Sequence, residues 1–315
     1  MRAFALLLTF VLVPCVLAAE PDAAAEAARV LERYLKTPHP VGPARTDPYD
    51  AKKDAEVNGA RRARLAVLAE LAAMPREAVS AAEPVIFKQA SPPQRYEIVS
   101  TLGERIQTRE CAELLHRVFQ DVREPKDPDA ATYEGLVRTA AVHGLRLMAR
   151  RVDRSGGKRI QRGPEVEPKV PGLLPYLVSA AGDKAERVRV AALYALADTR
   201  DPAAVTELRN RLRDESDAVR LRAACFLTEF QDATGLPEMR QALVRFHETD
   251  LRTSGDRAMQ AEMLLASLER LTGKSFGEIP LNPLLSSSSS GGEARRYKEL
   301  LDTWAAWWNW QPDAK

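Results

Sequence analysis

The chain has 315 residues, of which 45% are apolar, 29% charged and 6% aromatic. This balance excludes a disordered chain, and the many strong helix formers with few β-branched runs predict an all-α protein. The formal net charge of +2 lacks the basic excess of a nucleic-acid-binding protein, so no nucleic-acid partner is expected.

Residues 1–18 have the pattern of a cleaved signal peptide. A positive residue precedes an apolar segment that ends at Val13, and Val16-Leu17-Ala18 provides a cleavage site. The apolar segment is shorter than the about 20 residues of a membrane-spanning helix, and we expect no stable membrane span in the mature chain. The sequence therefore predicts an exported protein, periplasmic or secreted, cut near Ala18. Retention of the segment as an anchor is an alternative; lipidation at Cys15 is disfavoured by the preceding Pro14.

Residues 19–57 are predicted to hold one short helix and a proline-rich linker. Three prolines between positions 38 and 43 cannot continue a helix, so the helix ends at about Lys36. Its helical spacing places four residues on one side, namely Ala27, Val30, Leu31 and Tyr34.

Residues 58–273 contain an internal repeat with an offset of 31 residues. The segment Val188–Leu196 aligns with Val219–Leu227, and the same offset aligns Asp183 with Asp214. It also aligns residues further along, namely Asp201 with Asp232, Val205 with Leu236, Leu208 with Met239, and Leu212 with Leu243. A repeat of this length indicates stacked supersecondary units.

Each unit contains two helical segments. We expect Asp201-Pro202 to start the second segment, with Asp as the N-cap and Pro at the first helical position. The first segment carries Val188, Ala192, Ala195 and Leu196 on one face, and the second carries Val205, Leu208 and Leu212.

The segment Asp183–Leu196 reads Asp-x4-Val-Arg-x2-Ala-x2-Ala-Leu and resembles HEAT repeats of the bacterial, lyase-associated kind; Asp214–Leu227 is nearly the same, and Val137–Leu145 is a weaker copy. The resemblance implies an armadillo-type fold, a right-handed α-α superhelix (α-solenoid) of about five to six helical pairs over residues 58–273. A polar, basic loop insertion is expected at 153–170.

Residues 274–292 are predicted to be a flexible Ser/Gly linker, and residues 293–315 a tryptophan-rich helix. This last helix holds all four tryptophans, and Trp304, Trp307 and Trp308 share one helical face. We expect the helix to pack on the solenoid as a cap. In the alternative interpretation, Trp307 and Trp308 form an aromatic patch that binds a partner.

No pattern in the sequence indicates catalysis. Serine-nucleophile and phosphate-loop motifs are absent, and no His or Cys pair has metal-ligand spacing. HEAT-fold hydroxylases with a di-iron centre use several His-Glu pairs, whereas this chain has one, His247-Glu248. His143 is expected to be packed and hydrogen-bonded. We therefore predict no catalytic residue, no metal, no cofactor and no enzymatic activity.

Two further sets of residues are given structural roles. Cys111 and Cys225 lie in apolar helical patterns about three repeats apart, so we expect buried free thiols. A recurring Arg follows Val in the repeats at positions 138, 189 and 220, with Arg95 in register. These arginines are expected to form a ladder with turn aspartates, for which the candidates are Asp183, Asp214 and Asp217.

The predicted partner-binding surface lies on the second helices, which we expect to line the concave side. This surface is predicted to carry a strip of basic side chains, namely Arg209, Arg213, Arg240 and Arg245. Such a strip favours an acidic segment of a partner protein. The sequence therefore predicts a protein-protein interaction scaffold of the cell envelope. The alternative is an enzyme accessory or lyase-type module that acts on a bound small molecule.

Overall fold

The computed structural model describes residues 22–37, 51–151, 166–247, 255–279 and 291–309. The predicted signal peptide and most of the insertion predicted at 153–170 lie outside the described residues. The described residues contain no strand, and their α-helices are α1 (Ala23–Lys36), α2 (Ala51–Ala69), α3 (Pro75–Pro84), α4 (Pro92–Arg105), α5 (Arg109–Gln120), α6 (Pro128–Ala149), α7 (Leu174–Ala181), α8 (Glu186–Thr199), α9 (Ala204–Asn210), α10 (Asp217–Leu227), α11 (Leu236–His247), α12 (Gly255–Thr272) and α13 (Gly291–Asn309).

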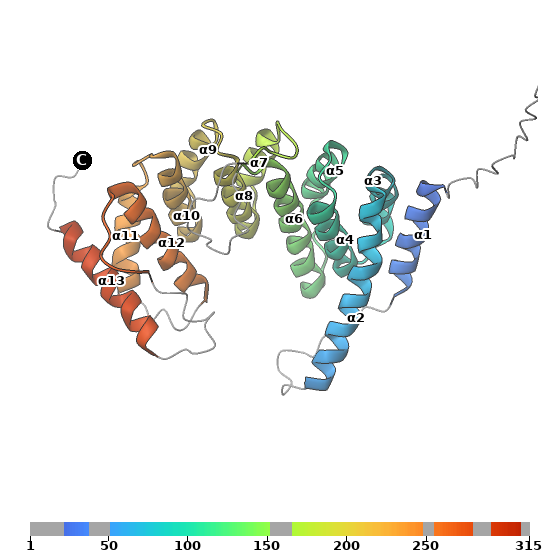
Figure 1. The fold of residues 1–315 in the computed structure, drawn as a ribbon, viewed down its shortest axis with the longest axis horizontal. Helices are drawn as coiled ribbons and strands as arrows, with labels where there is room; N and C mark the ends of the chain where they lie inside the picture. The colour runs from blue at the N-terminus through green and yellow to red at the C-terminus, as the bar shows by residue number, and fades with distance from the viewer. Residues whose placement is uncertain (1–21, 38–50, 152–165, 248–254, 280–290, 310–315) are drawn as a thin grey trace, which may run out of the picture.

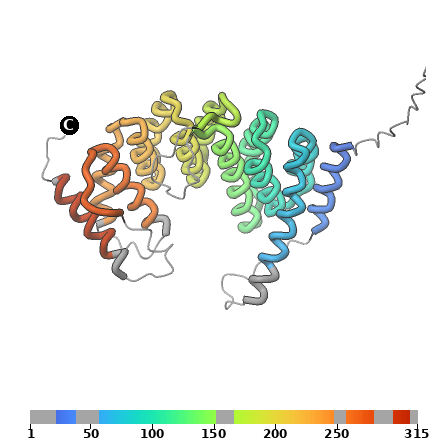
Figure 2. Tube along the Cα trace, in the orientation of Figure 1, coloured from blue at the N-terminus to red at the C-terminus, as the bar shows by residue number. Residues whose placement is uncertain are grey.

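The helices form an arc of two rows, which confirms the prediction of an all-α solenoid (Figures 1 and 2). The inner row, on the hollow side of the arc, contains α2, α4, α6, α8, α10 and α12, each packed on the next. The outer row includes α3, α5, α7 and α9. In the described part of the chain, no helix is long and apolar enough to cross a membrane.

Local sequence signals set the helix starts. Asp127 caps α6 by accepting from the amide of Ala130 at 3.0 Å, and Pro128 occupies the first helical position. Ser216 caps α10 in the same way. The start of the predicted second segment differs, because α9 begins at Ala204, and Asp201 accepts from the amide of Ala203 in the turn before it.

The core lies between the two rows. The predicted buried face of α8 is confirmed, since Val188, Ala192, Ala195 and Leu196 are all fully buried. Leu208 of α9 is buried opposite this face, whereas the predicted core residues Val205 and Leu212 are half-buried. Each inner helix thus buries one apolar face against the outer row, and packing against neighbouring units buries its remaining apolar side chains.

Helices α4 and α6 come into backbone contact where two glycines meet. A Cβ atom added to Gly103 would lie 2.7 Å from the Gly144 Cα atom. A Cβ added to Gly144 would lie 2.6 Å from Leu115 Cδ1 and 2.8 Å from the Gly103 Cα atom. Any larger residue at either position would therefore force the two backbones apart.

Buried arginines join each unit to the next, as the ladder prediction stated. Arg138 of α6 donates to the buried Asp183 in the turn before α8 and to the Phe119 carbonyl at 3.1 Å. Arg95 of α4 is fully buried, and its partners are Glu134 of α6 and, at 2.8 Å, Asp121.

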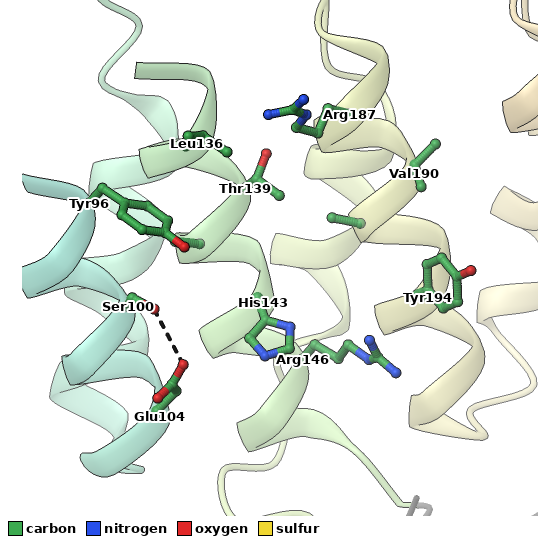
Figure 3. Close-up of a pocket in the computed structure, with 12 residues that line it drawn as sticks. Tyr96, Ser100, Glu104, Leu136, Thr139, His143, Arg146, Arg187, Val190 and Tyr194 are labelled. Carbon is green, nitrogen blue, oxygen red and sulfur yellow. Dashed lines mark hydrogen bonds between the residues drawn. The ribbon is translucent and has the colours of Figure 1, made fainter. Parts of the chain in front are cut away.

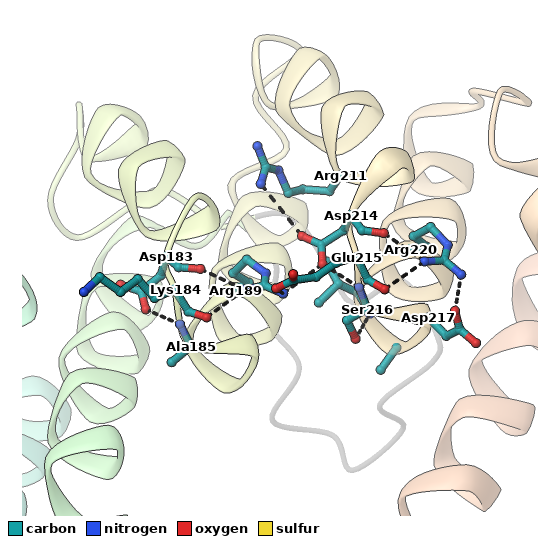
Figure 4. Close-up of polar contacts among 12 residues, drawn as sticks. Asp183, Lys184, Ala185, Arg189, Arg211, Asp214, Glu215, Ser216, Asp217 and Arg220 are labelled. Atoms are coloured by element: carbon teal, nitrogen blue, oxygen red, sulfur yellow. Dashed lines mark hydrogen bonds and ion pairs between the residues drawn. The ribbon is translucent and has the colours of Figure 1, made fainter. Parts of the chain in front are cut away.

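The next unit repeats this pattern, whereas Arg220 pairs within its own unit (Figure 4). Arg189 of α8 donates to Asp214 at 2.9 Å, in the turn before α10. Arg220 of α10 pairs with Asp217, and also with Glu238 of α11 at 3.2 Å. Arg95, Arg138 and Arg189 are buried, and each makes more than one polar contact, which reduces the cost of desolvating the charge. Arg220 is half-buried, and its partner Asp217 is exposed.

Both ends of the described array are covered by helices. At the amino-terminal end, α1 packs on α3, and the four residues predicted to share its face are buried. At the other end, α13 packs on α11 and buries Tyr297, Leu301 and Trp304. Helix α13 therefore contacts the solenoid as a cap.

Candidate functional site

A groove of about 450 Å³ opens on the inner row, across α4, α6 and α8 (Figure 3). It lies on the hollow side of the arc, where a superhelix offers its extended binding surface. Its lining residues are Tyr96, Ser100, Glu104, Leu136, Thr139, Ala140, His143, Arg146, Arg187, Val190, Ala191 and Tyr194.

The lining residues recur at three- and four-residue spacing, so each helix presents one stripe to the groove. Tyr96, Ser100 and Glu104 form the stripe of α4. Leu136, Thr139, Ala140 and His143 follow on α6, and Arg187, Val190, Ala191 and Tyr194 on α8. Small residues at the middle of the stripes leave the groove floor open between a tyrosine on either side.

Arg146 is held in place by its neighbours on α8. Its guanidinium donates to Asp198 at 2.6 Å and lies 5.3 Å from the centre of the Tyr194 ring. The carboxylate offsets most of the positive charge, and the ring face adds a cation-π contact. Arg146 thus shapes one wall of the groove and fixes the Tyr194 ring there.

Arg187 and Glu104 give the groove opposite charges at its two edges. Arg187 is exposed in the first turn of α8 and, within the described residues, makes no ion pair. Its side chain extends toward α6, near Thr139 (Figure 3). Glu104 of α4 is exposed and accepts from the Ser100 hydroxyl at 3.3 Å. The α8 edge is therefore cationic and the α4 edge anionic.

His143 lies between Glu104 and Arg146 (Figure 3). Partial burial in the groove lowers the pKa of His143 from its ordinary value, and the positive charge of Arg146 adds a smaller effect in the same direction. The negative charge of Glu104 acts in the opposite direction. The groove therefore favours the neutral imidazole. The prediction of a packed histidine is wrong, because more than a third of this side chain faces the groove.

The predicted strip of arginines does not face the groove. The placement of Arg209 on the concave side is wrong, because α9, which carries it, belongs to the outer row. Arg209 is also paired with Asp232 at 2.6 Å, and Arg245 with Glu238 at 2.8 Å.

Arg213 and Arg240 are exposed, and neither makes an ion pair within the described part of the chain. They are therefore available for contact on the surface outside the groove. The partner-binding role assigned to the four arginines stays a prediction.

Trp307 and Trp308 are half-buried near the end of the array. Trp307 packs at 5.5 Å from the buried Trp304, and both contact Phe276. Lys274 lies 5.8 Å from the centre of the Trp307 ring. These contacts account for much of the aromatic surface, and partner binding by Trp307 and Trp308 stays a prediction.

Among the described residues, no group of three or more His, Cys, Asp or Glu side chains could hold a metal ion. For the His247-Glu248 pair, the His247 side chain and Glu248 lie outside the described residues. Cys111 and Cys225 are free and buried, as expected. Burial raises the pKa of each thiol to about 12.

The groove residues could have been found from the sequence by a different choice of face. The repeat motif buries Val188 and Ala192, and the opposite side of the same helix carries Arg187, Val190 and Tyr194. Polar and aromatic residues at that side of three successive motif helices were the available signal. They were missed because the adjacent helix had been assigned to the concave surface.

Comparisons with known proteins agree with the repeat pattern. Residues 165–227, which contain α7 to α10, match the family model described as HEAT repeats. No curated protein sequence matches the chain. A solved structure of human deoxyhypusine hydroxylase in complex with glycerol is 17% identical, with 90% of this chain and 97% of that chain covered and a TM-score of 0.25.

The match to a hydroxylase contradicts the prediction that this chain is not an enzyme. That prediction had been drawn from absent motifs, and the matched protein is an enzyme. We therefore withdraw it. At this similarity the match assigns no activity, ligand or residue to the present chain.

Proposed function

Because this chain contains HEAT repeats within an α-solenoid, we propose that it is a protein-binding scaffold whose partner docks on the inner row at the groove of α4, α6 and α8. One observation carries the proposal: three successive inner helices present half-buried aromatic and aliphatic side chains beside Arg187, which is exposed and makes no ion pair with the residues that the structure describes. Aromatic residues and arginine are enriched at protein interfaces.

The proposal includes export to the cell envelope, either to the periplasm or to the outside. Its support is the amino-terminal pattern of a signal peptide. Fractionation of cells with amino-terminal sequencing of the recovered protein tests this part. We expect a mature chain that begins at Ala19, and recovery of an uncleaved chain in the cytoplasm would contradict export.

Site-specific photo-crosslinking tests the docking surface. A photoreactive residue replaces Val190 in the groove, and a matched variant carries it at Glu113, an exposed position of the outer helix α5. A partner in the groove gives a discrete adduct from position 190 and none from position 113. The additional substitution Ala191→Trp fills the groove floor and should remove the adduct. Equal crosslinking at both positions would refute docking at the groove.

A second candidate function is a module that acts on a bound small molecule. The volume of about 450 Å³ lies within the range of small-molecule sites, and His143, whose neutral form is favoured, faces the groove beside Glu104. Such a site predicts that a ligand raises the melting temperature of the protein. This effect would disappear in His143→Ala, whereas a bound protein segment would tolerate that change.

A further inference from the structure

The chemistry of the groove specifies a class of partner, and the inference rests on the docking proposed above. We propose that the groove binds an extended protein segment in which an acidic and an apolar residue are two positions apart. Arg187 receives the acidic side chain. The apolar side chain lies on the floor formed by Ala140 and Ala191, between Tyr96 and Tyr194.

The charge of the groove supports an acidic ligand at the α8 edge. Of the two arginines that line it, Arg146 is already paired with Asp198, while Arg187 has no ion pair within the described residues. Arg187 also lies in the first turn of α8, a helix of 14 residues whose amino-terminal end favours a negative charge. A carboxylate on the partner would therefore form an ion pair with Arg187 and also interact favourably with the helix dipole.

The charge on the far edge sets the position of that carboxylate. Glu104 lies across the groove on α4, and an acidic side chain placed there would meet a like charge. Glu186, the neighbour of Arg187 in the sequence, is exposed and does not line the groove. The acidic residue of the segment is thus favoured at Arg187 and disfavoured at Glu104.

The spacing of the two recognition points sets the separation of the two residues in the segment. Arg187 and Ala191 are one turn apart on α8, a rise of about 5–6 Å. In an extended chain, residues i and i+2 point to the same side and lie about 6.6 Å apart. An acidic and an apolar residue separated by one residue therefore match Arg187 and the floor beside Ala191, in either chain direction.

Defined peptides test this inference with the full chain. The probe is the fluorescein-labelled peptide Gly-Ser-Asp-Ser-Leu-Ser-Ala-amide, and its matched form has Asn in place of Asp. We expect the Asp peptide to bind the wild-type protein about twofold to fivefold more tightly by fluorescence anisotropy, the range of an exposed ion pair. R187A should remove this preference. R187E should instead bind a peptide with Lys in place of Asp more tightly than the Asp peptide.

Controls separate charge recognition from changes in folding. Arg76→Ala removes an exposed arginine of the outer helix α3 and should leave the preference intact. An unchanged far-ultraviolet circular dichroism spectrum of the Arg187 variants verifies their folding.

Equal binding of the Asp and Asn peptides, or a preference that survives R187A, would overturn the inference. The same holds if neither peptide binds. Crosslinking from position 190 is scored independently, so docking at the groove can stand when this partner class fails.

Discussion

The glycine pair between α4 and α6 allows a prediction in which one kind of substitution has opposite effects in a single helix. Gly135 and Gly144 both lie in α6. A Cβ atom at Gly135 would meet nothing within 4 Å, whereas at Gly144 it would lie 2.8 Å from the Gly103 Cα atom. Gly135→Ala therefore adds helix propensity alone, a gain of up to about 1 kcal/mol in the free energy of unfolding.

Gly144→Ala receives the same propensity gain and also a steric penalty. The opposing atoms are the backbone of Gly103 and the Leu115 side chain, and both are fully packed. Overpacking of this kind costs about 1–3 kcal/mol, and a backbone contact belongs at the upper end of that range. After the propensity gain is subtracted, we expect a net loss of about 1–2 kcal/mol. The two variants should therefore differ by about 2–3 kcal/mol.

Urea unfolding followed by far-ultraviolet circular dichroism measures the difference. The Gly135→Ala midpoint should move to higher urea and the Gly144→Ala midpoint to lower urea, with similar slopes of the free energy against urea. Matched slopes are necessary because long repeat arrays can unfold in more than one step. A shift of both variants in the same direction would refute the close approach of α4 and α6.

Three further outcomes follow from buried groups. Arg95→Met leaves carboxylates without their buried cation and should lower the free energy of unfolding in urea by about 3–5 kcal/mol. Arg117→Met, which breaks an exposed ion pair, should lower it by at most about 1 kcal/mol. Equal losses in the two variants would contradict the ladder. Burial lowers the pKa of His116 below 6.5, so the unfolded chain binds more protons and stability falls as pH drops below about 6.5. His116→Phe should therefore reduce the difference in melting temperature between pH 7.5 and pH 5.5 (about one unit on either side of that pKa), and an unchanged difference would count against this burial. In a Cys15→Ser background, Cys111 and Cys225 should react with a thiol reagent at pH 8 only after unfolding, because burial raises each thiol pKa to about 12; fast labelling of the native protein would show that they are accessible.

The repeat and its buried contacts could be predicted from the sequence because both depend on local spacing. The 31-residue offset placed Asp183 and Asp214 in equivalent turns, and the Arg after Val was the natural partner for each. The partner of Arg95 was missed, since Glu134 comes from a neighbouring helix 39 residues away and lies outside the repeated motif.

The direction in which the array curves could not be predicted in the same way. Both helices of a unit are amphipathic, so periodicity identifies the faces that meet between the rows and leaves the sign of curvature undetermined. For that reason Arg209 was assigned to the concave side although α9 lies in the outer row, and Arg187 was not considered as a binding residue.

The arginine ladder has a consequence for how such a chain can grow. Residues 183–213 contain one acceptor, Asp183, and one donor, Arg189, each of which serves a different neighbour. If this segment were copied in tandem, Arg138 would keep Asp183, the first Arg189 would meet the copied aspartate, and the second would meet Asp214. No charge of this ladder would lose its counterpart, so a lengthened gene product would keep the ladder intact from the moment of duplication, before any compensating mutation arose.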